Sequence, residues 1–142
     1  MWIYTSYGSY LFKYFRTFIN YINIIINTNT KSEIELSGEF AFGEVPIGTS
    51  SEPKVLTIHN PSCIPINISS ISVPNGYSSS FTSGSLQPSE TINVDIIFSP
   101  IATNQNQNYS GIITVNNDTD QVNNTIAVSG NGIIGNYEEL II

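Results

Sequence analysis

The chain of 142 residues has room for one domain with a modest core and a short additional segment. Its charged fraction of 11% is low, since globular proteins usually carry about 25%. Ser, Thr and Asn must therefore supply most of the polar surface, and they suit strand faces and turns better than helix interiors. The composition favours an all-β chain.

The charges are divided unevenly along the chain. Residues 1–31 contain three basic residues and no acidic residue, whereas the remainder contains eleven acidic residues and one basic residue, Lys54. An acidic module with a single lysine repels phosphate backbones, so we expect no nucleic-acid partner. The acidic residues are scattered, which is typical of a solvated surface.

The first thirty residues are aromatic and aliphatic and contain no proline. Apolar residues recur there at spacings of three and four, which fits one face of a helix. The other faces are nearly as apolar, so the sequence does not predict a cleanly amphipathic helix. The recurring residues are Tyr4, Tyr7, Leu11, Tyr14, Phe18, Tyr21 and Ile25.

The run FINYINIII follows Lys13 and Arg16. It is too short to span a bilayer, which needs about 20 apolar residues, but it suits the apolar region of a secretory signal. The following NTNT offers no usual cleavage site. We therefore interpret residues 1–31 first as an export signal or membrane-proximal anchor, with a packed helix or strand and a disordered leader as alternatives. Membrane contact is expected through this segment only.

From Glu33 onward the apolar residues alternate with a period of two. The clearest strand is TINVDIIF, in which Ile92, Val94, Ile96 and Phe98 are predicted to point inward. A phase shift at Ser69 and Ser70 predicts a β-bulge. Further strands are predicted at residues 33–36, 40–42, 55–60, 64–73, 109–115 and 125–129.

Turn residues separate these strands at regular intervals, for example at residues 74–76, 86–88 and 130–132. About seven short strands with turns every ~8–12 residues predict an immunoglobulin-like antiparallel β-sandwich. No strand alternates with a convincing helix, which argues against a parallel α/β fold. The predicted organisation is a leader at 1–31, a sandwich domain at 32–133 and a C-terminal tail at 134–142.

Residues that could carry chemistry occur singly. Cys63 is the only cysteine, so no internal disulfide can form, and we expect it to be half-buried in the core. His59 is the only histidine and lies in a predicted strand, which argues against a metal site or a catalytic triad. Gly43 and Gly48 fit no phosphate-binding motif and are expected to take positive φ at bends. We predict no catalytic, cofactor-binding or metal-binding residue, no cofactor and no enzymatic activity.

Two polar features, an aspartate pair and a set of Asn-x-Ser/Thr sequons, each allow more than one interpretation. Asp118 and Asp120 have the spacing of calcium-binding turns but lack the glutamate and glycine of an EF-hand loop. A polar hairpin loop is therefore favoured over a weak calcium site. Asn-x-Ser/Thr sequons begin at four positions, and chance explains most of them in so polar a chain. They are Asn67, Asn108, Asn117 and Asn123.

Tyr109 opens a predicted strand after the polar stretch ATNQNQN. This is the place of a tyrosine corner, in which the ring is buried and the hydroxyl bonds to the backbone. We expect Tyr109→Phe to lower the free energy of unfolding by about 1 kcal/mol.

Several short motifs occur in a characteristic order between residues 33 and 133. They are FGxVxxG from Phe42, LTIxN from Leu56, FSP from Phe98, YSGxITV from Tyr109 and VSGxG from Val128. The set resembles the ASPM/SPD-2/Hydin (ASH) immunoglobulin-like family, in its bacterial choice-of-anchor D style. The resemblance implies a seven-stranded sandwich that is not an enzyme and acts as a spacer or interaction module.

We therefore expect a non-catalytic structural or protein-interaction module of an exported or surface-associated protein. Its contacts with a protein partner of unknown identity would use an exposed edge strand or end loops such as SVPNGYSSSF. One alternative is an intracellular scaffold of ciliary or centrosomal type, in the cytoplasm or cilium. Another is a weak calcium- or carbohydrate-dependent binder that uses Asp118, Asp120 and exposed aromatic side chains at Tyr77 and Phe81.

Overall fold

The computed structural model describes residues 4–29, 32–101, 105–119 and 124–135. The chain divides into two compact units, Met1–Lys31 and Ser32–Ile142. The first contains the helix α1 (Tyr4–Asn29), as the spacing of three and four between its apolar residues suggests. Among the described residues, no helix combines the length and hydropathy that crossing a membrane requires.

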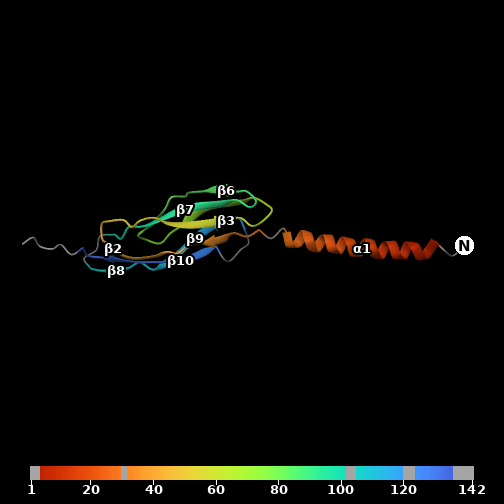
Figure 1. Ribbon diagram of the computed structural model, residues 1–142, viewed down its shortest axis with the longest axis horizontal. Helices are drawn as coiled ribbons and strands as arrows, with labels where there is room; N and C mark the ends of the chain where they lie inside the picture. Colours follow the sequence, from red (N-terminus) through yellow and green to blue (C-terminus); the bar gives the residue numbers. More distant parts are fainter. Residues whose placement is uncertain (1–3, 30–31, 102–104, 120–123, 136–142) are drawn as a thin grey trace, which may run out of the picture. The chain divides into compact units, whose positions relative to one another are not determined.

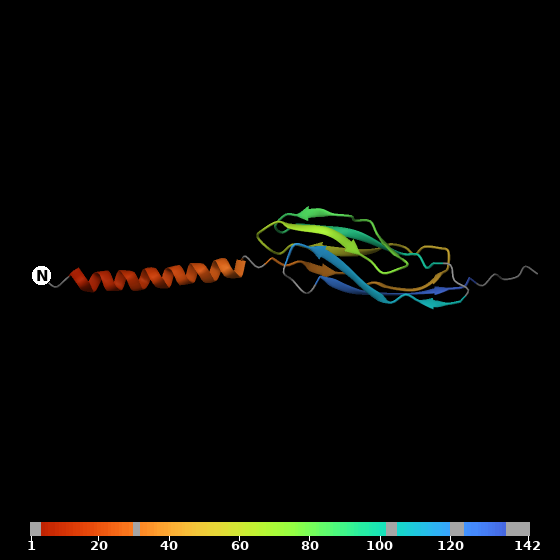
Figure 2. The ribbon, with the colours of Figure 1, turned by 180° about the vertical axis from the view of Figure 1, so that it is seen from behind.

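The second unit is a sandwich of two sheets, seen from two sides in Figures 1 and 2. Neighbouring strands of the first sheet are all antiparallel. In order across the sheet they are β1 (Glu35–Ser37), β3 (Lys54–His59), β7 (Thr91–Phe98) and β5 (Tyr77–Ser79).

The second sheet has one parallel pair, formed by its first two strands, and is otherwise antiparallel. Its order is β2 (Ala41–Pro46), β10 (Thr125–Ile133), β9 (Gly111–Asn117), β4 (Ile66–Ser72) and β6 (Gly84–Leu86), and β8 (Gln107–Asn108) also pairs with β10. The predicted immunoglobulin-like β-sandwich is confirmed.

The core lies between the sheets and follows the predicted alternation. Leu56 and Ile58 of β3 are fully buried, and so are Ile96 and Phe98 of β7. Burial of each such side chain contributes about 1.5–3 kcal/mol. The opposing sheet contributes further buried residues, among them Ile66, Ile68, Ile113, Val115 and Val128.

The outer faces of the sheets carry hydrogen-bonded polar pairs in place of charges. Thr57 Oγ1 donates to Asn93 Oδ1 at 3.1 Å, and His59 Nδ1 lies 2.8 Å from Thr91 Oγ1 on the neighbouring strand. The Asn116 amide donates to two serine hydroxyls of β4. Cross-strand pairs of this kind stabilise a sheet, which explains how so few charged residues suffice.

Three short strands, β5, β6 and β8, were not predicted, because two or three residues are too few to show alternation. Gly130 and Gly132, predicted as a turn, lie inside β10. The bulge at Ser69 and Ser70 is confirmed by the register shift between β4 and β9. Ile64, the first residue of the strand predicted at 64–73, lies before β4 and is 40% exposed.

Candidate interaction surface

The sandwich has two lateral sides, each formed by one edge strand of each sheet. β1 and β5 end the first sheet, and β2 and β6 end the second. Residues 38–40 join β1 directly to β2, and residues 80–83 join β5 directly to β6. These short connections place β1 with β2 on one side and β5 with β6 on the other. Edge strands present backbone groups with no partner in the sheet, so each side is a candidate for pairing with another chain.

The β1/β2 side carries features that discourage pairing. Glu35 and Glu44 place charges on the two edge strands, and Pro46 removes one backbone donor from β2. Gly43, within β2, has a φ of +70° that interrupts the extended backbone. Charges, proline and local distortion are the usual means by which proteins protect a sheet edge.

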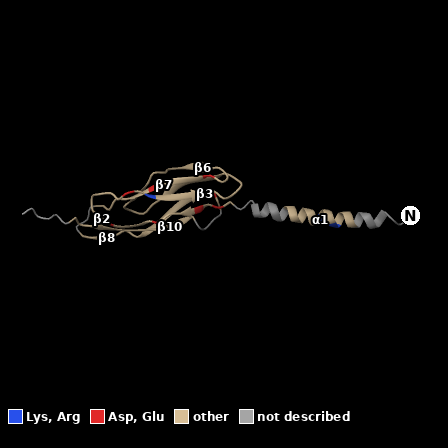
Figure 3. Ribbon diagram, viewed as in Figure 1, with Lys and Arg blue, Asp and Glu red and all other residues tan. Residues whose placement is uncertain are grey.

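The β5/β6 side has no such protection. Residues 55–89, which include β4, β5 and β6, contain no Asp, Glu, Lys or Arg, and β6 is accordingly drawn in tan in Figure 3. The two edge strands, YSS and GSL, also contain no proline. In a module with a net charge of −7 over the whole chain, this is an uncharged edge.

The backbone of Ser85 points to this open edge. In β4, the N–H of Asn67 donates to Asp118 Oδ1 at 2.9 Å, and its carbonyl accepts from the N–H of Asp118. Both groups of Asn67 therefore point away from β6. Ser85 lies directly opposite Asn67, and because backbone groups alternate between sides in an antiparallel pair, its N–H and C=O point outward. Ser85 can thus donate to and accept from an added strand.

Tyr77 fixes β5 to the core. Its ring stacks on Phe98 with a centroid distance of 4.8 Å, and its hydroxyl donates to the Tyr109 carbonyl at 2.7 Å. Burial raises the pKa of Tyr77 to about 12. The expectation that Tyr77 and Phe81 are exposed aromatic side chains is wrong, since Tyr77 is buried and Phe81 packs half-buried against the core. The predicted carbohydrate-binding surface therefore lacks the two exposed aromatic side chains on which it depended.

The predicted tyrosine corner at Tyr109 is present but weak. The ring is buried, and the hydroxyl donates to the Ile101 carbonyl at 3.3 Å. This distance is longer than that of a good O–H···O bond. The shorter tyrosine-to-backbone bond belongs to Tyr77, whose position in a three-residue strand gave no sequence signal.

A buried asparagine, Asn60, anchors β6 at the other end of the edge. Its amide nitrogen lies 3.1 Å from the carbonyls of both Leu86 and Gln87, and 2.9 Å from that of Ile64. Its Oδ1 accepts from the backbone N–H and the hydroxyl of Ser62. Sequence reasoning missed this role. The available signal was the asparagine that ends the LTIxN motif, directly after a buried strand.

The residues singled out from sequence lie apart from one another. His59 is on the outer face of β3, as predicted, and Gly43 and Gly48 have positive φ, as predicted. Cys63 is exposed, so its predicted half-buried place in the core is wrong. It lies in the connection before β4, where flanking prolines keep the chain on the surface.

The carboxylate of Asp118 ties the connection after β9 to β4. Its two oxygens accept from the backbone N–H and the side-chain amide of Asn67, at 2.9 and 2.7 Å. These bonds hold the pKa of Asp118 below its ordinary value. Asp120 and Asn123 lie outside the described residues. Within the part of the chain that the structure describes, no three His, Cys, Asp or Glu side chains are grouped as a metal site needs.

The side-chain amides of three sequon asparagines are engaged in the fold. Asn67 donates to Asp118, Asn108 donates to Asn131 Oδ1 at 2.9 Å, and Asn117 donates to the Val115 carbonyl. Their hydrogen bonds give each a local structural role.

Comparisons with known proteins identify similar solved structures and a matching family. Among solved structures, the chain is similar to the ASH/PapD-like domain of human CEP192 (PapD-like domain 7), with 17% identity, a TM-score of 0.50 and coverage of 75% of this chain and 87% of that one. It also matches the Salmonella enterica SafA pilin in complex with the SafB chaperone (13%, 0.46, 73% and 55%) and the E. coli chaperone DraB (12%, 0.44, 72% and 56%). The search of curated proteins gave no match. The family model "Abnormal spindle-like microcephaly-assoc'd, ASPM-SPD-2-Hydin" matches residues 37–121, and the chain therefore belongs to the ASH family.

Proposed function

We propose that this ASH domain is a non-catalytic interaction module that binds a protein partner by adding a β-strand of that partner to its β5/β6 edge. The observation that carries the proposal is the uncharged edge, in contrast to the charged and proline-bearing β1/β2 side. In strand addition, backbone hydrogen bonds supply affinity and neighbouring side chains supply specificity. The outward N–H and C=O of Ser85 are the groups that would bond to the partner strand.

Photo-crosslinking at the edge tests this function. A photo-reactive amino acid at Ser83, which is exposed beside β6, should give covalent adducts with a protein partner in cells. Ser85→Pro removes the outward donor, and proline is tolerated on an edge strand, so it should abolish the adducts. The matched control, Ser85→Ala, keeps the backbone N–H and should retain them.

A charged variant and a check of folding complete the test. Ser85→Lys, which places a charge beside the edge, should also reduce the adducts. A melting curve close to that of the wild type would show that each variant is folded. Adducts that persist in folded Ser85→Pro and Ser85→Lys proteins, or that form instead from a reactive group at Asn93 on the sheet face, would contradict the edge proposal.

We further propose that the domain is of the bacterial choice-of-anchor D type and belongs to an exported or surface-associated protein. A basic, acid-free N-terminal segment ahead of an acidic Ser/Thr/Asn-rich domain supports this location. Cell fractionation with N-terminal sequencing tests it. A chain that stays in the cytosol with Met1 intact would contradict it, whatever the result of the crosslinking.

A further inference from the structure

One face of α1 is apolar and exposed. Successive residues of an α-helix are turned by about 100°, so residues three and four apart share a face. Phe15 and Phe18 have 64% and 59% of their surface exposed, and a contiguous exposed apolar patch commonly marks a site of protein or membrane interaction. The apolar face consists of Leu11, Phe12, Phe15, Phe18, Ile19 and Ile22.

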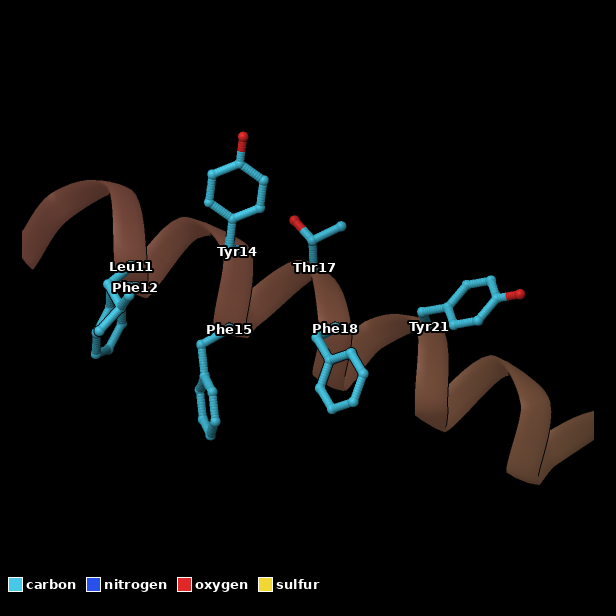
Figure 4. Close-up of a pocket in the computed structure, with 7 residues that line it drawn as sticks. All are labelled: Leu11, Phe12, Tyr14, Phe15, Thr17, Phe18 and Tyr21. Atoms are coloured by element: carbon cyan, nitrogen blue, oxygen red, sulfur yellow. The ribbon is translucent and has the colours of Figure 1, made fainter. Parts of the chain in front are cut away.

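The opposite face is polar and basic. It carries Lys13, Arg16, Thr17 and Asn20, and three tyrosines lie along one boundary between the faces. Figure 4 shows the Phe15 and Phe18 rings on one side of the helix and Thr17 on the other. The expectation that all faces are nearly equally apolar is therefore wrong for residues 10–22. The hollow in Figure 4 is lined by side chains of α1 alone, so it belongs to the surface of this helix.

The charge of α1 has a single sign. Lys13 and Arg16 are its charged residues, and residues 1–31 contain no acidic residue that could neutralise them. They are three positions apart and on the same face. The helix thus combines an aromatic apolar face with a basic polar face. A surface that fits both faces needs an apolar layer bordered by negative charge.

We propose that α1 binds the surface of an anionic lipid bilayer, with its axis in the membrane plane. The apolar face enters the boundary of the acyl chains, and Lys13 and Arg16 lie among the headgroups. Phenylalanine and leucine opposite lysine and arginine are typical of helices that lie in the interface. Tyrosine side chains favour the same layer, because the ring is apolar and the hydroxyl remains in water.

A second copy of α1 fits this surface less well. Paired helices are oriented by opposite charges that flank the contact, and α1 has no acidic residue to place opposite Lys13 or Arg16. Anionic lipids supply that negative charge, and each basic residue near the membrane strengthens binding about fivefold.

The positions of the charges favour an in-plane orientation. Lys13 and Arg16 lie near the middle of α1, so a helix that crossed the bilayer would bring both toward its centre, where charged side chains are unfavourable. An in-plane helix keeps both in contact with water.

The inference rests on the surface association proposed above, since membrane binding by α1 would attach the chain to a membrane surface. It is independent of the partner at the β5/β6 edge.

Vesicle binding by the full chain tests the inference. The protein should sediment with vesicles of phosphatidylcholine and phosphatidylglycerol, and much less with phosphatidylcholine alone. Binding should weaken as salt is raised, because salt screens charges near the surface. The single tryptophan, Trp2, precedes α1, and its fluorescence should shift to shorter wavelength on binding. Oriented circular dichroism should report a helix parallel to the bilayer.

Matched variants separate the two faces. Lys13→Gln with Arg16→Gln should lower the binding constant on anionic vesicles roughly thirtyfold, with little change on neutral ones. Phe15→Ser with Phe18→Ser should lower binding to both by at least about tenfold. Lys54→Gln removes a basic residue of the sandwich and should leave vesicle binding unchanged.

Three outcomes would overturn the inference. The first is equal binding to neutral and anionic vesicles, and the second is a helix oriented across the bilayer. The third is a lack of vesicle binding by a chain that sedimentation equilibrium shows to be dimeric, with the dimer lost in the Phe15→Ser, Phe18→Ser variant. None of these vesicle results depends on crosslinking at Ser83 or on cell fractionation, so failure here is distinguishable from failure of either proposal above.

Discussion

At the scale of single residues, Asn60 has the highest density of buried hydrogen bonds. Its side chain joins the end of β3, the following connection and the end of β6. A buried polar group that loses its partner costs about 1–3 kcal/mol, and the carbonyls of Leu86 and Gln87 accept from this amide. Asn60 therefore holds the uncharged edge in place from inside the sandwich.

Asn60→Ala is expected to lower the free energy of unfolding by about 3 kcal/mol, since it leaves several buried groups unsatisfied. Urea unfolding of the variant and the wild type measures the change. Asn93→Ala, which removes an exposed cross-strand bond from Thr57, is the control and should change it by no more than about 1 kcal/mol. Equal effects of the two substitutions would show that Asn60 has no special role.

Tyr77→Phe is expected to lower the free energy of unfolding by about 1–2 kcal/mol at neutral pH, because the Tyr109 carbonyl loses its donor. Tyr109→Phe should have a smaller effect, because its hydroxyl bond is 3.3 Å long. Denaturant unfolding of both variants measures the difference. A larger loss for Tyr109→Phe would reverse this assignment of the stronger bond.

The raised pKa of Tyr77 also predicts a dependence on alkaline pH. The unfolded tyrosine loses its proton near pH 10, whereas the folded one keeps it to about 12. Burial thus contributes stability that is fully present below pH 10 and is lost as the pH rises from 10 to 12. Unfolding measured across this range should show a steeper decline for the wild type than for Tyr77→Phe, and parallel curves would contradict the burial of this hydroxyl.

At the scale of elements, β10 depends on glycines that face aromatic rings. A Cβ at Gly130 would lie 2.6 Å from a ring carbon of Phe98, and one at Gly132 would lie 2.7 Å from Pro100. These glycines allow β10 to approach the cluster of Phe98, Tyr77 and Tyr109. A glycine inside a strand commonly marks such close approach.

Gly130→Ala is expected to destabilise the sandwich by about 1–3 kcal/mol, since the added methyl overlaps the Phe98 ring. Gly43→Ala is the comparison, because nothing lies near its Cβ but its φ is +70°. It should cost about 1–2 kcal/mol through backbone strain alone. Combining Gly130→Ala with Phe98→Leu should recover part of the loss if ring overlap is the cause, and thermal melting of the three proteins measures this.

At the scale of the whole molecule, the two units differ in composition and charge. The N-terminal unit is basic and aromatic, while residues 32–142 are acidic and rich in Ser, Thr and Asn. Among the described residues, those that form the core of the sandwich lie in its own strands and connections, from Ile34 to Val128. The proposed domain boundary near residue 32 follows from this division.

Residues 32–142 alone are expected to fold, because every core residue in the described part of the chain lies within them. Their melting temperature should lie within a few degrees of that of the full chain, as measured by far-ultraviolet circular dichroism. A fragment that does not fold, while the full chain does, would show that the boundary is misplaced.

Much of the fold was predictable because alternation in long strands reflects burial directly. TINVDIIF identified both the extent and the inward face of β7. The candidate interaction surface was less predictable. β5 and β6 are too short for a periodic signal, and the outward direction of the Ser85 backbone depends on its pairing with Asn67 in β4.

The sequence by itself determined the class of fold and the segregation of charge, and it suggested one helical face near the N-terminus, because hydrophobic period and composition are local properties of the chain. Only the tertiary structure decided which edge is unprotected, that Tyr77 is buried and that Asn60 joins three segments. These features depend on contacts between residues far apart in sequence, among them Asn60 with Leu86 and Tyr77 with Tyr109. Such pairings are set by strand order and register, which a pattern of alternating residues does not encode.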